Sequence, residues 1–218
     1  AYDIRLSDWS SDVCSSDLWI REKNSFSLLK NGNSRAVENE ILASKICRCF
    51  DCRQVLYEES MFDGQKVSKS RIITSVDYSM VSMEAFEIYA ANHDIHVMDF
   101  VLKLDAYSYY MMNLLDYLIG NTDRHWGNWG FLVDNRTNQP VRLFDLMDLN
   151  QTFLAYDTPD GANCMTTGNR KMSQREAAVE AVKKIGLNQR AEIKDEWFEG
   201  REKEREMFWC RFGILKEQ

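Results

Sequence analysis

The first third of the chain alternates short apolar runs with turn-forming residues, a pattern typical of strands. The run at 26–30 ends at Asn31-Gly32-Asn33, after which Ser34 is suited to cap a helix. Asp63-Gly64 separates two β-rich runs and predicts a hairpin. The elements expected here are a strand at 26–30, a helix from 34 to about 47, hairpin strands at 55–62 and 66–74, and a polar connector at 75–82.

From residue 82 onward the pattern becomes helical. One apolar stripe has helical spacing and consists of Tyr110, Met111, Leu114, Leu115, Leu118 and Ile119. Ser173 and Glu176 have the spacing of a capping box, and Gly186 stops that helix. The expected elements are helices at 83–93 and 97–119, a hairpin at 130–133 and 141–144, an irregular loop at 154–172, and helices at 173–185 and 191–211. The order predicts an α+β fold in which a small β-rich lobe (19–80) precedes a larger helical lobe (81–218).

Composition narrows the class of protein. The 218 residues are 44% hydrophobic, enough for one core or for two small lobes that share a cleft. The net charge of −7 argues against a nucleic-acid backbone as the main partner, and no apolar run is long enough to cross a membrane. No secretory signal is recognisable. Three of the six cysteines crowd together at Cys47, Cys49 and Cys52, which favours reduced thiols in a cytoplasmic protein.

Residues 1–18 differ from the rest. They are rich in Ser and Asp and show neither helical nor strand period. Back-translation of residues 8–18 gives a nucleotide string that matches a common short-read sequencing adapter. We therefore interpret residues 1–18 as adapter-derived and expect them to be disordered. On this interpretation the genuine chain starts near Trp19, lacks part of its N-terminal lobe, and is expected to have weak activity or none without that part.

The candidate chemistry centres on a polar loop between the long apolar helix and the following hairpin. This loop, residues 120–130, places Asp123 and Asn128 five positions apart. Transfer of a phosphoryl group from ATP needs a carboxylate near the attacking hydroxyl and oxygen ligands for Mg²⁺. Kinase catalytic loops supply both with an Asp and an Asn at this spacing. The spacing alone is common, but its place between helix and hairpin strengthens the interpretation.

Further residues complete the pattern, with two alternatives left open. A second metal ligand is expected after the hairpin, either Asp145 or Asp148; we prefer Asp148, because Asp148-Leu149-Asn150 is similar to the Asp-Phe-Gly segment of kinases. Lys30 ends an apolar strand, where a kinase places the lysine that reaches the α- and β-phosphates. Either Glu38 or Glu40 on the next helix can pair with this lysine.

Together these segments resemble the HipA-like serine/threonine protein kinases of bacteria. The resemblance rests on Asn-Thr-Asp123-x-His125-x-x-Asn128, on the Asp after the hairpin, and on Leu29-Lys30 followed by Val-Glu-Asn-Glu40. It covers roughly residues 24–160. It implies ATP and Mg²⁺ as cofactors and a protein substrate. The implied residues are Asp123 as base, Asn128 and Asp148 as metal ligands, Lys30 on the phosphates, Glu40 as its partner and His125 near the γ-phosphate or bracing the loop. Some members are toxins paired with an antitoxin.

The sequence also departs from this pattern. No glycine-rich phosphate loop precedes Lys30, and the loop motif Asp-Arg-His-x-x-Asn also occurs in phosphoinositide-type lipid kinases. The alternatives are therefore an inactive kinase-like binding module and a lipid or small-molecule kinase. A zinc site at the cysteine cluster, or a metal at His93 and His96, is disfavoured because neither set has the ligands to complete a site.

Overall fold

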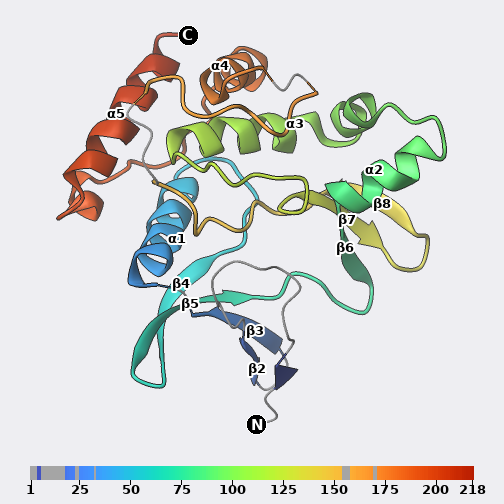
Figure 1. Cartoon of the computed structure of the whole chain (residues 1–218), viewed down its shortest axis with the longest axis horizontal. Coiled ribbons are helices and arrows are strands. Elements are labelled where there is room, and N and C mark those ends of the chain that lie inside the picture. The colour runs from blue at the N-terminus through green and yellow to red at the C-terminus, as the bar shows by residue number, and fades with distance from the viewer. Residues whose placement is uncertain (1–3, 6–17, 23–24, 32, 154–157, 169–170) are drawn as a thin grey trace.

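Two antiparallel sheets and five α-helices build the part of the chain that the computed structural model describes, namely residues 4–5, 18–22, 25–31, 33–153, 158–168 and 171–218 (Figure 1). The strands are β1 Ile4–Arg5, β2 Leu18–Glu22, β3 Ser25–Lys30, β4 Tyr57–Phe62, β5 Gln65–Arg71, β6 Tyr78–Ser82, β7 Gly130–Asp134 and β8 Gln139–Leu143. The helices are α1 Ser34–Cys47, α2 Met83–Ala91, α3 Val97–Leu118, α4 Gln174–Ile185, the 3₁₀ turn η1 Asp195–Phe198, and α5 Glu202–Lys216.

The first sheet has the strand order β1-β2-β3-β5-β4. Its β4–β5 hairpin turns at Asp63 and Gly64, whose φ angles of 48° and 73° are those of the predicted primed turn. β3 pairs with β5 so that Lys30 lies opposite Ser68. α1 begins where predicted, but its cap is Asn33 and not Ser34, because the Asn33 side chain accepts a hydrogen bond from the backbone N–H of Ala36 (2.8 Å).

The second sheet, in the order β6-β7-β8, corrects one expectation. Residues 75–82 do not form a purely polar connector, since β6 lies within them and pairs with β7. The two strands approach closely at Gly130, where a Cβ atom would lie 2.1 Å from the carbonyl oxygen of Val81. Only glycine fits this position. The sequence pattern missed β6 because its partner strand comes about fifty residues later.

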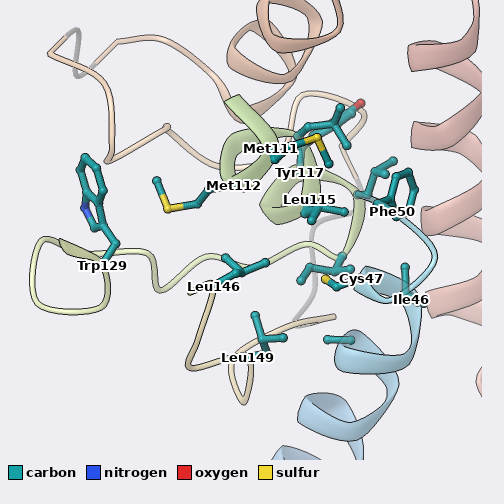
Figure 2. Close-up of a cluster of buried hydrophobic side chains, with 14 of the residues drawn as sticks. Ile46, Cys47, Phe50, Met111, Met112, Leu115, Tyr117, Trp129, Leu146 and Leu149 are labelled. Atoms are coloured by element: carbon teal, nitrogen blue, oxygen red, sulfur yellow. The ribbon is translucent and has the colours of Figure 1, made fainter. Parts of the chain in front are cut away.

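The helical part is organised around α3. Apolar side chains from the C-terminal half of this helix meet the end of α1 and the segment after β8 (Figure 2). Figure 2 labels ten of them: Ile46, Cys47, Phe50, Met111, Met112, Leu115, Tyr117, Trp129, Leu146 and Leu149. The core therefore joins the helix after Lys30 to the segment that carries Asp148.

The C-terminal helices follow the prediction in part. α4 has the expected capping box between Ser173 and Glu176 and ends at Gly186, whose φ is 78°. The single helix expected at 191–211 is wrong. The structure has η1, then a break, then α5 extending to Lys216. Gly200, with a φ of 69°, lies in the break, because a left-handed residue cannot continue a right-handed helix.

The N-terminal segment is described only in part. Of residues 1–18, the structure describes Ile4, Arg5 and Leu18, which lie in β1 and β2 and form strand pairs. The expectation of disorder for the rest of this segment, including Trp9 and Val13, lies outside the described residues. So do residues 154–157 and 169–170 of the irregular loop. None of the helices in the described ranges combines the length and apolar character needed to cross a bilayer.

Candidate active site

Lys30 lies at the centre of a cluster drawn from three parts of the chain. Its Nζ is 3.2 Å from Oε1 of Glu40 on α1 and 2.7 Å from Oδ1 of Asp148 after β8. The ammonium also lies 5.6 Å from the ring centroid of Tyr57 on β4. Burial alone would lower the pKa of Lys30, but the charges of its neighbours outweigh burial and raise it. The lysine is therefore held in its charged form.

Glu40 is buried, with 1% of its surface exposed. Its second carboxylate oxygen accepts a short hydrogen bond from the hydroxyl of Ser68. Burial raises the pKa of Glu40, while Lys30 and Ser68 oppose that rise. Glu38, the alternative partner, is half-buried and is not brought to the lysine. The structure thus places Glu40, not Glu38, against Lys30.

Asp148 is held in an unusual backbone conformation, with a φ of 56°. Its backbone N–H donates to the hydroxyl of Tyr57 (3.0 Å), and the next residue, Leu149, is fully buried in the core. Burial would raise the pKa of Asp148, but the charge and hydrogen bond of Lys30 lower it, helped by Arg124. This carboxylate is therefore ionised and is aimed at the lysine.

A buried arginine fixes the loop at 120–130. Arg124 donates two hydrogen bonds to the carboxylate of Asp116 on α3, at 2.9 and 3.0 Å. Its Nη1 donates to the carbonyl oxygens of Asn128 (2.7 Å) and Met147 (2.6 Å). Asn121 also donates to Asp116 (2.8 Å). One side chain therefore ties the loop to the residue directly before Asp148.

Asp123 and Asn128 both lie in the 120–130 loop that the hydrogen bonds of Arg124 hold in place. The Asn128 amide nitrogen donates to the carbonyl oxygen of Asp123 (2.9 Å). Partial burial raises the pKa of Asp123; His125 opposes this rise and the charge of Asp148 adds to it. The charge of the Asp148 carboxylate therefore affects the pKa of Asp123. A raised pKa makes Asp123 a better proton acceptor while it is ionised.

His125 and Asp145 differ in how they relate to this cluster. His125 is exposed, and its Nδ1 accepts a hydrogen bond from the backbone N–H of Gly127 (3.0 Å). Asp145 is not brought to the cluster. Its carboxylate pairs with Arg142 at 2.5 Å, because the chain turns between residues 145 and 148.

The oxygens at the site suit a hard cation such as Mg²⁺. The Asn128 amide nitrogen is bonded to the backbone, while Oδ1 accepts no hydrogen bond from the described residues. Asp148 adds a carboxylate from a neighbouring segment. Mg²⁺ commonly takes one or two protein oxygens and completes its shell with phosphates and water. Within the described ranges, no group of three or more His, Cys, Asp or Glu side chains could hold a metal ion. Neither the cysteine cluster nor the pair His93 and His96 is therefore part of such a group.

Sequence reasoning missed the residues that support this site: Tyr57, Ser68, Asp116, Asn121 and Arg124. One signal was available. Asp116 is a charged residue inside the apolar stripe of α3, where a buried acid requires a partner. The nearest cation that follows it in sequence is Arg124, eight residues later.

Comparison with known proteins agrees with this architecture. No family model and no curated protein matches the sequence. Among solved structures, the chain is similar to the proinflammatory kinase CtkA of Helicobacter pylori, with a TM-score of 0.62 and 15% sequence identity. The match covers 92% of this chain and 89% of that chain. At this identity the likeness shows the fold: the chain has a mixed α+β, kinase-like fold.

Proposed function

We propose that the chain is an ATP-dependent protein kinase of the HipA-like kind that phosphorylates serine or threonine hydroxyls. In this proposal a small β-rich lobe at residues 19–80 and a larger helical lobe at 81–218 enclose the nucleotide. The observation that carries it is the contact of one lysine, Lys30, with both Glu40 and Asp148 in a kinase-like fold. The toxin half of a toxin–antitoxin pair is the corresponding cellular assignment, with an antitoxin as partner.

Each residue has a distinct task in the proposed reaction. Lys30 binds the α- and β-phosphate oxygens, and Glu40 keeps its ammonium oriented. Asn128 and Asp148 would hold Mg²⁺, which offsets the negative charge of the phosphates when bound.

The transfer itself involves one bond made and one broken. The substrate hydroxyl oxygen forms a bond to the γ-phosphorus, and the bond to the ADP oxygen breaks. Asp123 accepts the hydroxyl proton, and its raised pKa suits it to that step. His125, exposed two residues after Asp123, would lie beside the γ-phosphate or brace the loop through its bond with Gly127.

The test separates the proton acceptor from the metal ligand. Asp123→Asn should reduce phosphoryl transfer about a hundredfold or more and leave ATP affinity nearly unchanged. Asp148→Asn should weaken Mg²⁺-dependent ATP binding about tenfold. The measurements are radiolabelled phosphate transfer and calorimetric ATP titration, each with and without Mg²⁺.

Asp145→Asn is the matched control, because Asp145 lies three residues from Asp148 and faces Arg142. It should bind ATP·Mg²⁺ as the unmodified chain does. The proposal is wrong if Mg²⁺ does not strengthen ATP binding by the unmodified chain, or if Asp145→Asn loses the Mg²⁺ effect while Asp148→Asn keeps it.

A further inference from the structure

A buried arginine at the start of α5 contacts the helix that carries Glu40. Arg201 is 8% exposed, and its Nη2 donates a short hydrogen bond to the side-chain oxygen of Asn39 on α1. The two residues are 162 positions apart in sequence. A second contact joins the same elements, since Arg35 at the start of α1 forms a close ion pair with Glu204 of α5. The start of α5 is therefore attached to α1 at two points.

Asn39 connects this attachment to the candidate site. It is fully buried and directly precedes Glu40, the residue that contacts Lys30. Its amide nitrogen donates to the carbonyl oxygen of Thr152 (2.6 Å), and the Thr152 hydroxyl lies 3.3 Å from the carbonyl oxygen of Asn39. Thr152 in turn donates to the carbonyl oxygen of Leu149 (2.8 Å), next to Asp148. Asn39 therefore touches both segments that supply carboxylates to Lys30.

The buried position of Arg201 disfavours the charged form of its guanidinium. Burial and the nearby charge of Arg35 lower the pKa of Arg201 to about 10. Its partners are modest: the neutral amide of Asn39, the ring of Phe153 with its centroid at 5.3 Å, and Glu204 at 3.7 Å. A buried cation with such partners contributes little net stability. What the planar guanidinium does provide is a fixed geometry between α1, Phe153 and the start of α5.

We infer that Arg201 is a positioning residue for the phosphoryl transfer proposed above. Through Asn39 it fixes the register of α1, and so the distance between Glu40 and Lys30. Through the bonds of Asn39 with Thr152 it also fixes the segment after Asp148. Loss of this arginine should let α1 move outward, leaving Lys30 with Asp148 as its remaining acidic partner. This inference rests on the proposed function for its kinetic consequence, but the contact between α1 and α5 is independent of that function.

The first experiment measures the position of α1 directly. Hydrogen exchange of the α1 amides at residues 37–41 should be about tenfold faster in Arg201→Met than in the unmodified chain. Arg211→Met is the matched control, because Arg211 is a buried arginine of α5 whose side chain donates to the carbonyl oxygens of Tyr117 (2.7 Å) and Thr158 (3.4 Å), both outside α1. It should leave α1 exchange unchanged. Equal α1 exchange in Arg201→Met and the unmodified chain would overturn the inference, whatever the chain catalyses.

The second experiment asks whether Arg201 acts through Glu40. Arg201→Met should lower kcat for transfer about tenfold, with a smaller change in the KM for protein substrate. Arg201→Lys should recover part of the loss, because an ammonium can reach Asn39 but lacks the planar fork. In a chain that already carries Glu40→Gln, adding Arg201→Met should change kcat less than twofold or so.

Independent effects would contradict the inference: if Arg201→Met lowers kcat as much in the Glu40→Gln background as alone, Arg201 does not position Glu40. If Arg201→Met fails to fold, Arg201→Lys carries both measurements, with an intermediate rise in α1 exchange expected. Failure of the proposed function is separate, because it would appear as ATP binding by the unmodified chain that Mg²⁺ does not strengthen, while the exchange result still tests the contact between α1 and α5.

Discussion

Two of the ion pairs in the candidate site, Arg124–Asp116 and Lys30–Asp148, differ in how firmly they are held. Between Arg124 and Asp116 the side chains are 4% and 5% exposed, and the guanidinium makes two parallel hydrogen bonds. Between Lys30 and Asp148 they are 17% and 26% exposed, and the ammonium is shared with Glu40. A planar fork in a dry environment has one favourable arrangement, whereas an ammonium can exchange one oxygen ligand for another.

This difference matches the proposed tasks of the two regions. The loop that carries Asp123 must hold its geometry before substrate arrives, because positioning supplies much of the rate enhancement in phosphoryl transfer. Lys30 must leave a carboxylate to reach phosphate oxygens, so a shared and partly hydrated ion pair is suited to it.

The largest effect is expected when the buried pair is broken. Arg124→Met leaves the Asp116 carboxylate buried without its cation and leaves the carbonyl oxygens of Asn128 and Met147 without their donor. Removal of one partner of a buried pair costs about 3–5 kcal/mol. Urea unfolding should show this loss as a lower midpoint. Arg142→Met, which breaks the less buried pair with Asp145, should cost about 1 kcal/mol. Equal losses in the two variants would contradict the comparison.

Features set by residues that are close together in the sequence could be predicted. Local signals were sufficient for the hairpin at Asp63-Gly64, for the capping box of α4, and for the spacing of Asp123 and Asn128 between a helix and a hairpin. Each depends on residues only a few positions apart. Backbone propensity and turn chemistry act over that range, so these features can be recognised without the fold.

Contacts between distant segments were not predictable in this way. Sequence reasoning left Glu38 and Glu40 open, because the helical positions alone do not show which residue faces Lys30. It also left Asp145 and Asp148 open, because the turn between them depends on Tyr57, which is 91 positions away from Asp148. β6 was missed for the same reason, since its partner β7 lies about fifty residues later in the chain.

A smaller effect is expected when the shared lysine loses one partner. Glu40→Gln keeps the shape of the side chain and can still bond Ser68, but it removes the charge that draws Lys30 away from Asp148. Lys30 should then compete more strongly with Mg²⁺ for Asp148, and ATP·Mg²⁺ affinity should fall about tenfold. Glu38→Gln is the matched control on the same helix and should have no effect on a calorimetric titration. Similar losses of ATP·Mg²⁺ affinity in the two variants would show that the negative charge of α1 matters and that the contact of Glu40 with Lys30 does not.

The smallest effect is the contribution of the Lys30–Asp148 pair to stability, on the order of 1 kcal/mol because both side chains remain partly hydrated. Burial alone would raise the pKa of Asp148, but Lys30 lowers it below its ordinary value of about 3.9. The unfolded chain therefore takes up this proton at a higher pH than the folded chain does. Stability from the pair is present above about pH 5 and is lost as the pH falls through the lowered pKa of the folded state. Urea midpoints of the unmodified chain and Asp148→Asn should differ by a constant amount from pH 7 to about pH 5 and converge below about pH 4. If burial, and not Lys30, dominated the environment of Asp148, the pKa of the folded state would be raised. The urea midpoint of the unmodified chain would then rise relative to that of Asp148→Asn as the pH falls.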